Sequence, residues 1–267
     1  MLKIFIRHKW DGKEQVLKDL FQQGKIAIRY DNIRSINPND YKQVKSKSSL
    51  KLLKKCCKEG AFVGAVYRKY KPSSMLVGKI KPGSKIKAEL YDNGDMILKT
   101  VKLFSHREAS PIILLANQPR FSTICKWHTV EKQLEDIVNG KKISFDVHSL
   151  HPSQLEVICY EYLRKKGILK ALLIPIGRTL RDVDIYGIDS KGGEVMAQVT
   201  FNDNKGYKMR QLQKYAHKNI YLYFFGPDSE INRKINGIKY ITVEKVFAEL
   251  KKNPVHHQMI KKMLSSQ

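Results

Sequence analysis

Residues 182–200 read DVDIYGIDSKGGEVMAQVT, and this stretch decides the fold of the C-terminal half. Asp182 and Asp184 precede a short apolar run, and the glycine pair at 192–193 separates that run from a second one that ends near Gln198. Two short runs joined by a glycine turn are typical of a β-hairpin. The pattern suits an ordinary hairpin with polar ends, and it equally suits half of a metal site in which an acid and an amide converge.

The chain has 267 residues, enough for two domains of ordinary size. We expect a first domain at 1–140 and a second at 141–267, because residues 131–150 are mixed and more polar than their surroundings. No segment approaches the roughly 20 apolar residues of a membrane span, and the N-terminal residues lack a continuous apolar stretch. We therefore expect a cytoplasmic, nucleoid-associated protein that does not bind membranes. The four cysteines have the spacing of neither a disulfide framework nor a zinc site.

Positive charge is the strongest global feature of the chain. The formal net charge is +25, divided as +16 over residues 1–150 and +9 over 151–267. A protein with this excess repels itself unless a polyanion neutralises it, and phosphate backbones release counterions when lysine and arginine bind them. Nucleic acid is the expected partner. A ribosomal or membrane-surface role, or a generally lysine-rich proteome, would also produce such an excess.

The first domain consists mainly of short apolar runs separated by turn residues. Their length and composition are typical of strands, and glycine and proline at the junctions favour tight turns. Helical spacing occurs at 11–21 and 48–57. The sequence therefore predicts a β-rich, barrel-like domain with two helices. The predicted strands are 25–30, 61–67, 75–80, 84–90, 95–100 and 111–115.

The second domain has a different pattern of predicted secondary structure, in which helices alternate with strands. A helix capped by Ser153 runs to Gly167, because apolar residues recur there at helical spacing. The predicted order is α-β-β-β-α-β-α, in the α+β or α/β class. After the first helix, the predicted elements are strands 171–176, 184–188 and 194–200, helix 207–217, strand 220–225 and helix 242–251.

This order, together with an aspartate at a hairpin bend and a strand that ends Gln-x-Thr, resembles the Mrr-like restriction endonuclease branch of the PD-(D/E)xK nuclease superfamily. The resemblance covers about residues 152–226. It implies a mixed sheet flanked by helices, with Asp184 as the catalytic aspartate. It also implies that Gln198 replaces the usual second-strand acid and that Glu156 is the helical glutamate.

The residue types suit a hard divalent cation such as Mg²⁺ or Mn²⁺. Mg²⁺ takes one or two carboxylates, keeps several waters and binds substrate phosphate. Asp184, the Gln198 amide oxygen, the Val199 carbonyl and Glu156 would supply that incomplete set of ligands. Such an ion lowers the pKa of its water and holds the scissile phosphate, which leads to hydrolysis of a phosphodiester.

Thr200 departs from the family pattern, which has a lysine at this position. A threonine hydroxyl carries no charge, so it cannot offset charge on the phosphate in the transition state. Either Lys205 or Lys208 supplies the missing ammonium from just beyond the strand, or the domain binds nucleic acid without cutting it.

The runs 60–67 (GAFVGAVY) and 75–80 (MLVGKI) of the first domain weakly resemble the PUA-like group, in which a curled sheet forms a pocket for an unusual or flipped base. Aromatic rings stack on an extruded base, and basic side chains contact phosphate. Each ring is equally well explained as a core residue. The candidate nucleic-acid-binding residues are Trp10, Tyr30, Tyr67, Arg120, Lys126 and Trp127.

The sequence therefore favours a metal-dependent DNA endonuclease of restriction or defence type, whose N-terminal domain recognises the target site or a modified base. Cleavage of both strands would favour a two-fold homodimer. Two alternatives remain: a degenerate nuclease fold that only binds DNA, and an RNA-binding or RNA-processing protein.

Overall fold

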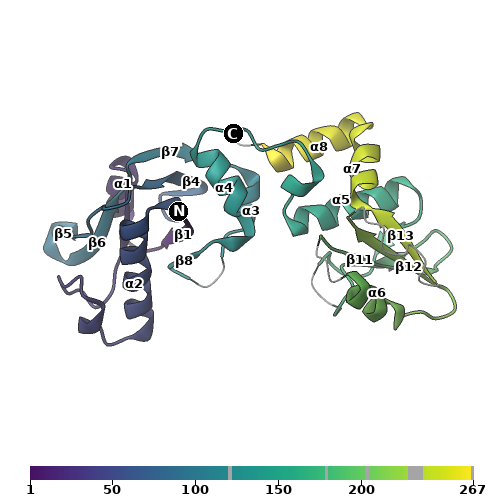
Figure 1. The fold of residues 1–267 in the computed structure, drawn as a ribbon, viewed down its shortest axis with the longest axis horizontal. Coiled ribbons are helices and arrows are strands. Elements are labelled where there is room, and N and C mark those ends of the chain that lie inside the picture. The colour runs from purple at the N-terminus through teal and green to yellow at the C-terminus, as the bar shows by residue number, and fades with distance from the viewer. Residues whose placement is uncertain (120–121, 178–179, 202–204, 228–236, 266–267) are drawn as a thin grey trace. The chain divides into compact units, whose positions relative to one another are not determined.

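The computed structural model describes residues 1–119, 122–177, 180–201, 205–227 and 237–265. The chain divides into two compact units, here called unit 1 (Met1–Ile143 with Leu264–Gln267) and unit 2 (Ser144–Met263). Both contain sheets flanked by helices, so the predicted mixed α and β class is confirmed (Figure 1). Among the described residues, no helix is long and apolar enough to cross a membrane.

Unit 1 contains a five-stranded sheet in the order β7-β4-β3-β1-β8. The central strand β3 is buried along its whole length, β1 runs parallel to it, and the other neighbouring pairs are antiparallel. The strands are β1 (Leu2–His8), β3 (Ala61–Tyr67), β4 (Lys71–Ile80), β7 (Ser105–Ala109) and β8 (Ile124–Lys126).

A second, three-stranded antiparallel sheet completes the strands of unit 1, in the order β2-β6-β5. Helix α1 turns Val16, Leu17, Leu20 and Phe21 inward, the face that its spacing predicted. Both sheets and both long helices contribute to one apolar core. The elements are α1 (Glu14–Gln22), β2 (Lys25–Ile28), α2 (Val44–Glu59), β5 (Lys87–Tyr91) and β6 (Met96–Lys102).

Several expectations for unit 1 were wrong or incomplete. The run 111–115 is helix α3 (Ile112–Ala116) and not a strand: Pro111 precedes it, and Ile113 and Leu114 are buried together. A five-residue apolar run has no periodicity that separates helix from strand. Strands β1, β7 and β8 were not predicted, and part of the polar 131–150 region is helix α4 (Glu131–Val138).

Over the residues that the structure describes, unit 2 follows the predicted order, with two additional elements, β13 and α8. Its five-stranded sheet has the order β13-β12-β11-β10-β9, in which β11, β12 and β13 are parallel and the β9-β10-β11 pairs are antiparallel. The elements are α5 (Pro152–Lys165), β9 (Ala171–Leu172), β10 (Ile185–Ile188), β11 (Glu194–Val199), α6 (Lys205–Gln213), β12 (Ile220–Gly226), β13 (Ile238–Thr242), α7 (Val243–Lys251) and α8 (Pro254–Leu264).

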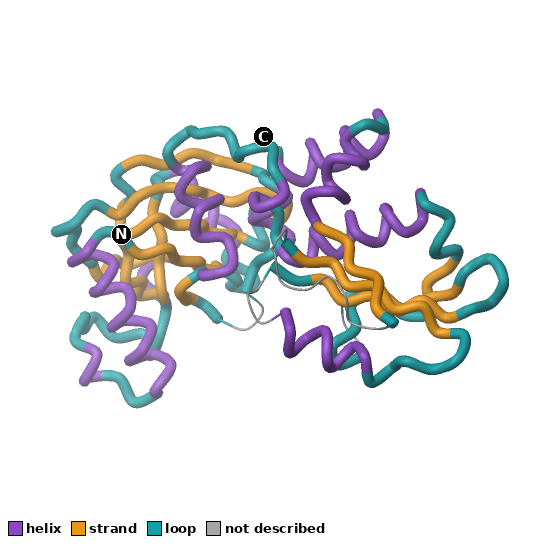
Figure 2. Tube along the Cα trace, turned by 45° about the vertical axis from the view of Figure 1, so that its right-hand side comes forward, coloured by secondary structure: helices purple, strands orange, loops and turns teal. Residues whose placement is uncertain are grey.

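Helices cover both faces of this sheet. Leu212 of α6 packs with Met196 and Leu222 on one face, and Tyr162 of α5 contacts the ring of Phe225 on the other. Figures 1 and 2 show α6 on one side of the strands, and α5 with α7 on the opposite side. Side chains alternate between faces along a strand, so Gln198 lies on the same face as Met196. The N-cap of α5 is His151, not the predicted Ser153.

His8 is a fully buried titratable group in unit 1. Its Nε2 accepts a hydrogen bond from Ala27 N at 3.0 Å, so Nδ1 carries the proton and lies 3.2 Å from the carbonyl oxygen of Val66. The ring stacks on Tyr67, with a centroid distance of 4.3 Å. Burial lowers the pKa of His8 to about 4, because the imidazolium would lose its hydration and the acceptor role of Nε2.

The stability of unit 1 should therefore depend on pH through His8. The unfolded chain takes up the proton near pH 6.5 and the folded chain only near 4. The stabilisation is complete above pH 6.5 and is lost as pH falls, at about 1.4 kcal/mol per pH unit. Denaturant titrations of the parent and His8→Phe between pH 7.5 and 4.5 measure it. Identical pH dependence in both proteins would contradict the assignment.

Candidate active site

The backbone of Asp184 is fixed on both sides at the start of β10. Its amide N donates to the carbonyl oxygen of Ala197 at 2.8 Å, and its carbonyl oxygen accepts from Gly177 N at 2.8 Å. The side-chain Oδ2 accepts from Val199 N at 2.8 Å and from the Gln198 side-chain amide. The hairpin thus brings the predicted aspartate and the predicted amide into direct contact.

The Gln198 side chain links two oxygen atoms. Its Nε2 donates to Asp184 Oδ2 and also to the Val199 carbonyl oxygen, at 3.1 Å. Its Oε1 is buried and has no hydrogen-bond partner among the described residues. A buried acceptor without a donor is costly. A half-turn of the amide would place Oε1 beside the two other oxygens, so three oxygen atoms can surround one point.

Glu156 lies on α5 and packs against Gly177. A Cβ atom added at Gly177 would lie 2.3 Å from Glu156 Oε2, and Gly177 has a positive φ of 77°. Burial, and then the negative charge of Asp184, raise the pKa of Glu156 to about 7, while the charge of Lys208 opposes this shift. Glu156 and Asp184 therefore interact electrostatically.

Burial also raises the pKa of Asp184, against the opposing effects of the Val199 N–H, Lys208 and the Gln198 amide. Lys208 lies in the first half of α6, is partly buried, and stabilises the charged form of both carboxyls. Thr200 is buried, and its N donates to the carbonyl oxygen of Phe225 at 2.9 Å. The side chain of Lys205 lies outside the described part of the structure.

The donor set suits a hard cation more than a soft one. Within the described ranges, no three His, Cys, Asp or Glu side chains form a cluster able to hold a metal ion. Two carboxyls, an amide oxygen and a backbone carbonyl remain, and such oxygen donors suit Mg²⁺ or Mn²⁺, which keep water ligands. In the structure, Nε2 of Gln198 faces Asp184 and Val199, so the amide oxygen joins this donor set only after the half-turn of the amide.

Comparison with known proteins gives only distant likenesses. No family model and no curated protein matches the chain. A solved structure described as an EndoMS complex with double-stranded DNA aligns at 14% identity and a TM-score of 0.27, over 64% of this chain and 73% of that one. A repair endonuclease from Pyrococcus abyssi aligns at 13% identity and a TM-score of 0.24, over 64% and 74%. At these scores, function must be argued from the site itself.

Two residues near the carboxyls were not predicted from the sequence. Gly177 makes room for Glu156, and Cys159, one helical turn beyond Glu156, is fully buried with a pKa raised first by burial and then by Asp184 and Glu156. The spacing of three between Glu156 and Cys159 could have placed the thiol on the same helix face. The contact with Gly177 had no comparable signal.

The predicted aromatic candidates of unit 1 lie mostly in its core. Tyr67 is 0% exposed and Trp127 is 1% exposed, so neither ring is available to stack on a base. Trp10 and Tyr30 are partly buried against the same core, and the Tyr30 hydroxyl lies 3.0 Å from Ser49 Oγ. Lys126 is exposed, and Arg120 lies outside the described residues.

The fit of Gly177 against Glu156 can be tested with a matched pair of glycines. Gly177→Ala should destabilise the chain more than Gly167→Ala, which has a similar φ of 67° but open space around an added Cβ. Each substitution carries a backbone cost of roughly 1–3 kcal/mol, and only Gly177→Ala also displaces a carboxylate. Denaturant unfolding measures the difference. Equal losses for the two variants would contradict the close contact.

Proposed function

We propose that the chain is a divalent-cation-dependent DNA endonuclease of the restriction or defence type, whose active site lies in unit 2 and whose unit 1 contacts the target. The observation that carries the proposal is the meeting of Asp184 Oδ2, the Val199 carbonyl and the Gln198 amide, with Glu156 and Lys208 in electrostatic contact with the same carboxyl.

The carboxyls have the electrostatic character of a functional site. Two acids with raised pKa values lie near one another beside a lysine, and a fold gains no stability from this arrangement alone. A positive ion would relieve the repulsion between the acids. Asp184, Glu156, Gln198 and Val199 would hold the ion, which supplies charge to neutralise phosphate and to acidify water.

Lys208 carries the role that the family pattern gives to a lysine at position 200. Its partly buried ammonium stabilises negative charge at both carboxyls, so it can also offset negative charge on a phosphate bound beside them. The net charge of +25 draws a polyanionic substrate toward the protein.

A second candidate function is nucleic-acid binding without cleavage. Thr200 favours it, because its buried, uncharged side chain occupies the position of the motif lysine. This candidate keeps the fold and the basic surface but has no turnover. The two candidates differ in what the removal of a carboxylate or of Lys208 should do.

Asp184→Asn tests the enzyme directly. The substitution keeps the shape of the side chain and removes its charge, so Mg²⁺- or Mn²⁺-dependent cleavage of duplex DNA should fall by roughly a hundredfold or more. Affinity for the same duplex without divalent ion should be retained. The assay runs in parallel with duplex RNA, and faster cleavage of RNA would correct the substrate class. Cleavage by Asp184→Asn at the parent rate would refute the site.

Lys208→Met removes one positive charge with little change in side-chain length. The matched control is Lys214→Met, because Lys214 lies just beyond the end of α6 and its ammonium donates to the side-chain oxygen of Gln211. If Lys208 acts on the phosphate, only Lys208→Met should lose cleavage, and Lys208→Arg should recover part of it. Equal cleavage rates for Lys208→Met and Lys214→Met would contradict this role of Lys208, whereas no cleavage by the parent with either Mg²⁺ or Mn²⁺ would favour the non-cleaving candidate.

A further inference from the structure

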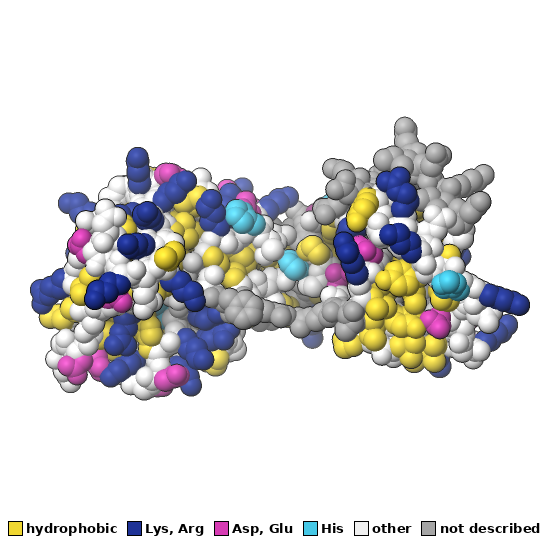
Figure 3. Space-filling model, turned by 90° about the horizontal axis from the view of Figure 1, so that it is seen from below, with side chains coloured by type: hydrophobic (Ala, Val, Ile, Leu, Met, Phe, Trp, Pro, Cys, Tyr) yellow, Lys and Arg dark blue, Asp and Glu magenta, His cyan; other side chains and the backbone are white. Residues whose placement is uncertain are grey.

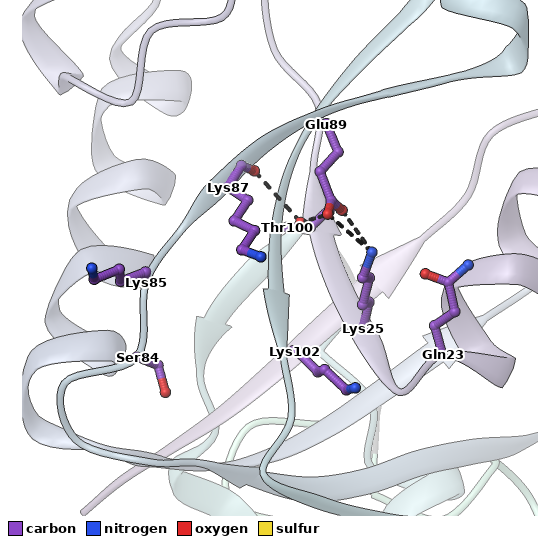
Figure 4. A pocket seen from close by; sticks show the side chains of 8 residues that line it. All are labelled: Gln23, Lys25, Ser84, Lys85, Lys87, Glu89, Thr100 and Lys102. Atoms are coloured by element: carbon purple, nitrogen blue, oxygen red, sulfur yellow. Dashed lines mark hydrogen bonds and ion pairs between the residues drawn. The ribbon is translucent and has the colours of Figure 1, made fainter.

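A cavity of about 530 Å³ opens on the three-stranded sheet of unit 1, and none of its lining residues was among the candidates from the sequence. The volume is in the range of sites for small ligands and nucleotide-sized groups. Figure 4 shows the cavity from close by. Its lining residues are Gln23, Lys25, Ser84, Lys85, Lys87, Glu89, Thr100 and Lys102.

The strand register places the basic side chains of the cavity on one face. Lys25 of β2 lies opposite Lys102 of β6, and Lys87 of β5 lies opposite Thr100 of β6. Thr100 and Lys102 are two residues apart, so they point to the same face. Three lysines from three adjacent strands therefore converge. In Figure 4, the side chain of Lys85 turns the other way.

The one acid of the cavity is already neutralised. Glu89 Oε2 lies 2.8 Å from Lys25 Nζ and accepts from Thr100 Oγ1 at 2.7 Å. Burial would raise the pKa of Glu89, but the hydrogen bonds from Lys25 and Thr100 outweigh it and hold the pKa below its usual value. Glu89 is therefore ionised and fixed beside Lys25.

Lys87 and Lys102 remain available for a ligand. Both are exposed, and neither forms an ion pair among the described residues. Like charges on adjacent strands repel one another, so a sheet gains nothing by placing them together without an anion. Figure 3 shows basic side chains spread widely over the visible face of unit 1, so convergence in a cavity, rather than exposure alone, distinguishes this pair.

The lining favours phosphate over other ligands. The three converging lysines against one glutamate give a net charge of +2, and among the described residues no aromatic ring lines the cavity to stack on a base. Lysine binds phosphate as a compact point charge, without the planar geometry by which arginine reads a base edge. Such a surface positions a backbone and does not read its sequence.

We propose that this cavity binds phosphate groups of a nucleic acid backbone, so that the β2-β6-β5 sheet is the nucleic-acid-contacting surface of unit 1. The proposal takes its ligand class from the proposed function, and it replaces the buried aromatic rings with a lysine-lined sheet as the contact. Lys87 and Lys102 supply the phosphate contacts, and the Lys25–Glu89 pair holds the floor of the cavity in place.

Salt-dependent binding of the full-length chain to a fluorescent DNA duplex, without divalent ion, tests the proposal. Each lysine–phosphate contact contributes about 0.9 to the slope of log affinity against log salt, so Lys87→Ala/Lys102→Ala should lower the slope by about 2. Lys87→Arg/Lys102→Arg should retain it. The matched control Lys45→Ala/Lys51→Ala removes two exposed charges from α2 and should keep the parent slope.

Equal slopes for the two alanine pairs would overturn the proposal. A second outcome would also overturn it. If calorimetry shows that inorganic phosphate binds the parent but not Lys87→Ala/Lys102→Ala, while the two alanine pairs bind DNA equally, the cavity is a site for free phosphate and not for a nucleic acid backbone. The cleavage assay is a separate readout. If Lys87→Ala/Lys102→Ala has a lower salt slope and the parent does not cleave DNA, the cavity proposal is supported and the proposed enzyme is refuted. If Lys87→Ala/Lys102→Ala keeps the parent's slope and the parent shows cleavage that depends on Asp184, the proposed enzyme is supported and the cavity proposal is refuted.

Discussion

The partly buried carboxylate of Asp184, just before β10 and opposite Gln198 of β11, is the constraint on which the rest of unit 2 depends. The Val199 amide and the Gln198 side chain bind one carboxylate oxygen, and the Asp184 backbone joins the hairpin to Gly177. These bonds fix an acid in a site where its charge is unfavourable. Helices on both faces then bring Glu156 and Lys208 to it, one from α5 and one from α6.

The hairpin and the order of elements in unit 2 could be predicted because their signals are local. A glycine turn between two apolar runs and a helical spacing after residue 153 are both visible in the sequence. Strand β13 was missed because its burial does not alternate regularly along the strand. Strand β1, which lies between β3 and β8, was missed because the three apolar residues Ile4, Phe5 and Ile6 are too short a run to identify a strand.

The site could be predicted only in part, because some of its contacts join distant segments. Asp184 and Gln198 face each other across a hairpin, so their contact follows from strand pairing. The approach of Glu156 to Gly177 depends on how α5 packs, and no spacing in the sequence encodes it. In unit 1, two of the aromatic residues expected to stack on a base, Tyr67 and Trp127, are buried, because large aromatic side chains gain much free energy by leaving water.

The central claim is that oxygen atoms of Asp184, Gln198 and Val199 hold one divalent cation. Electron paramagnetic resonance of free Mn²⁺ titrated with the DNA-free protein measures it most directly. The parent should hold one Mn²⁺ per chain, with affinity weakened by about tenfold or more in Gln198→Leu and in Asp184→Asn. Equal Mn²⁺ binding by the parent and both variants, or no binding by any of them, would contradict it.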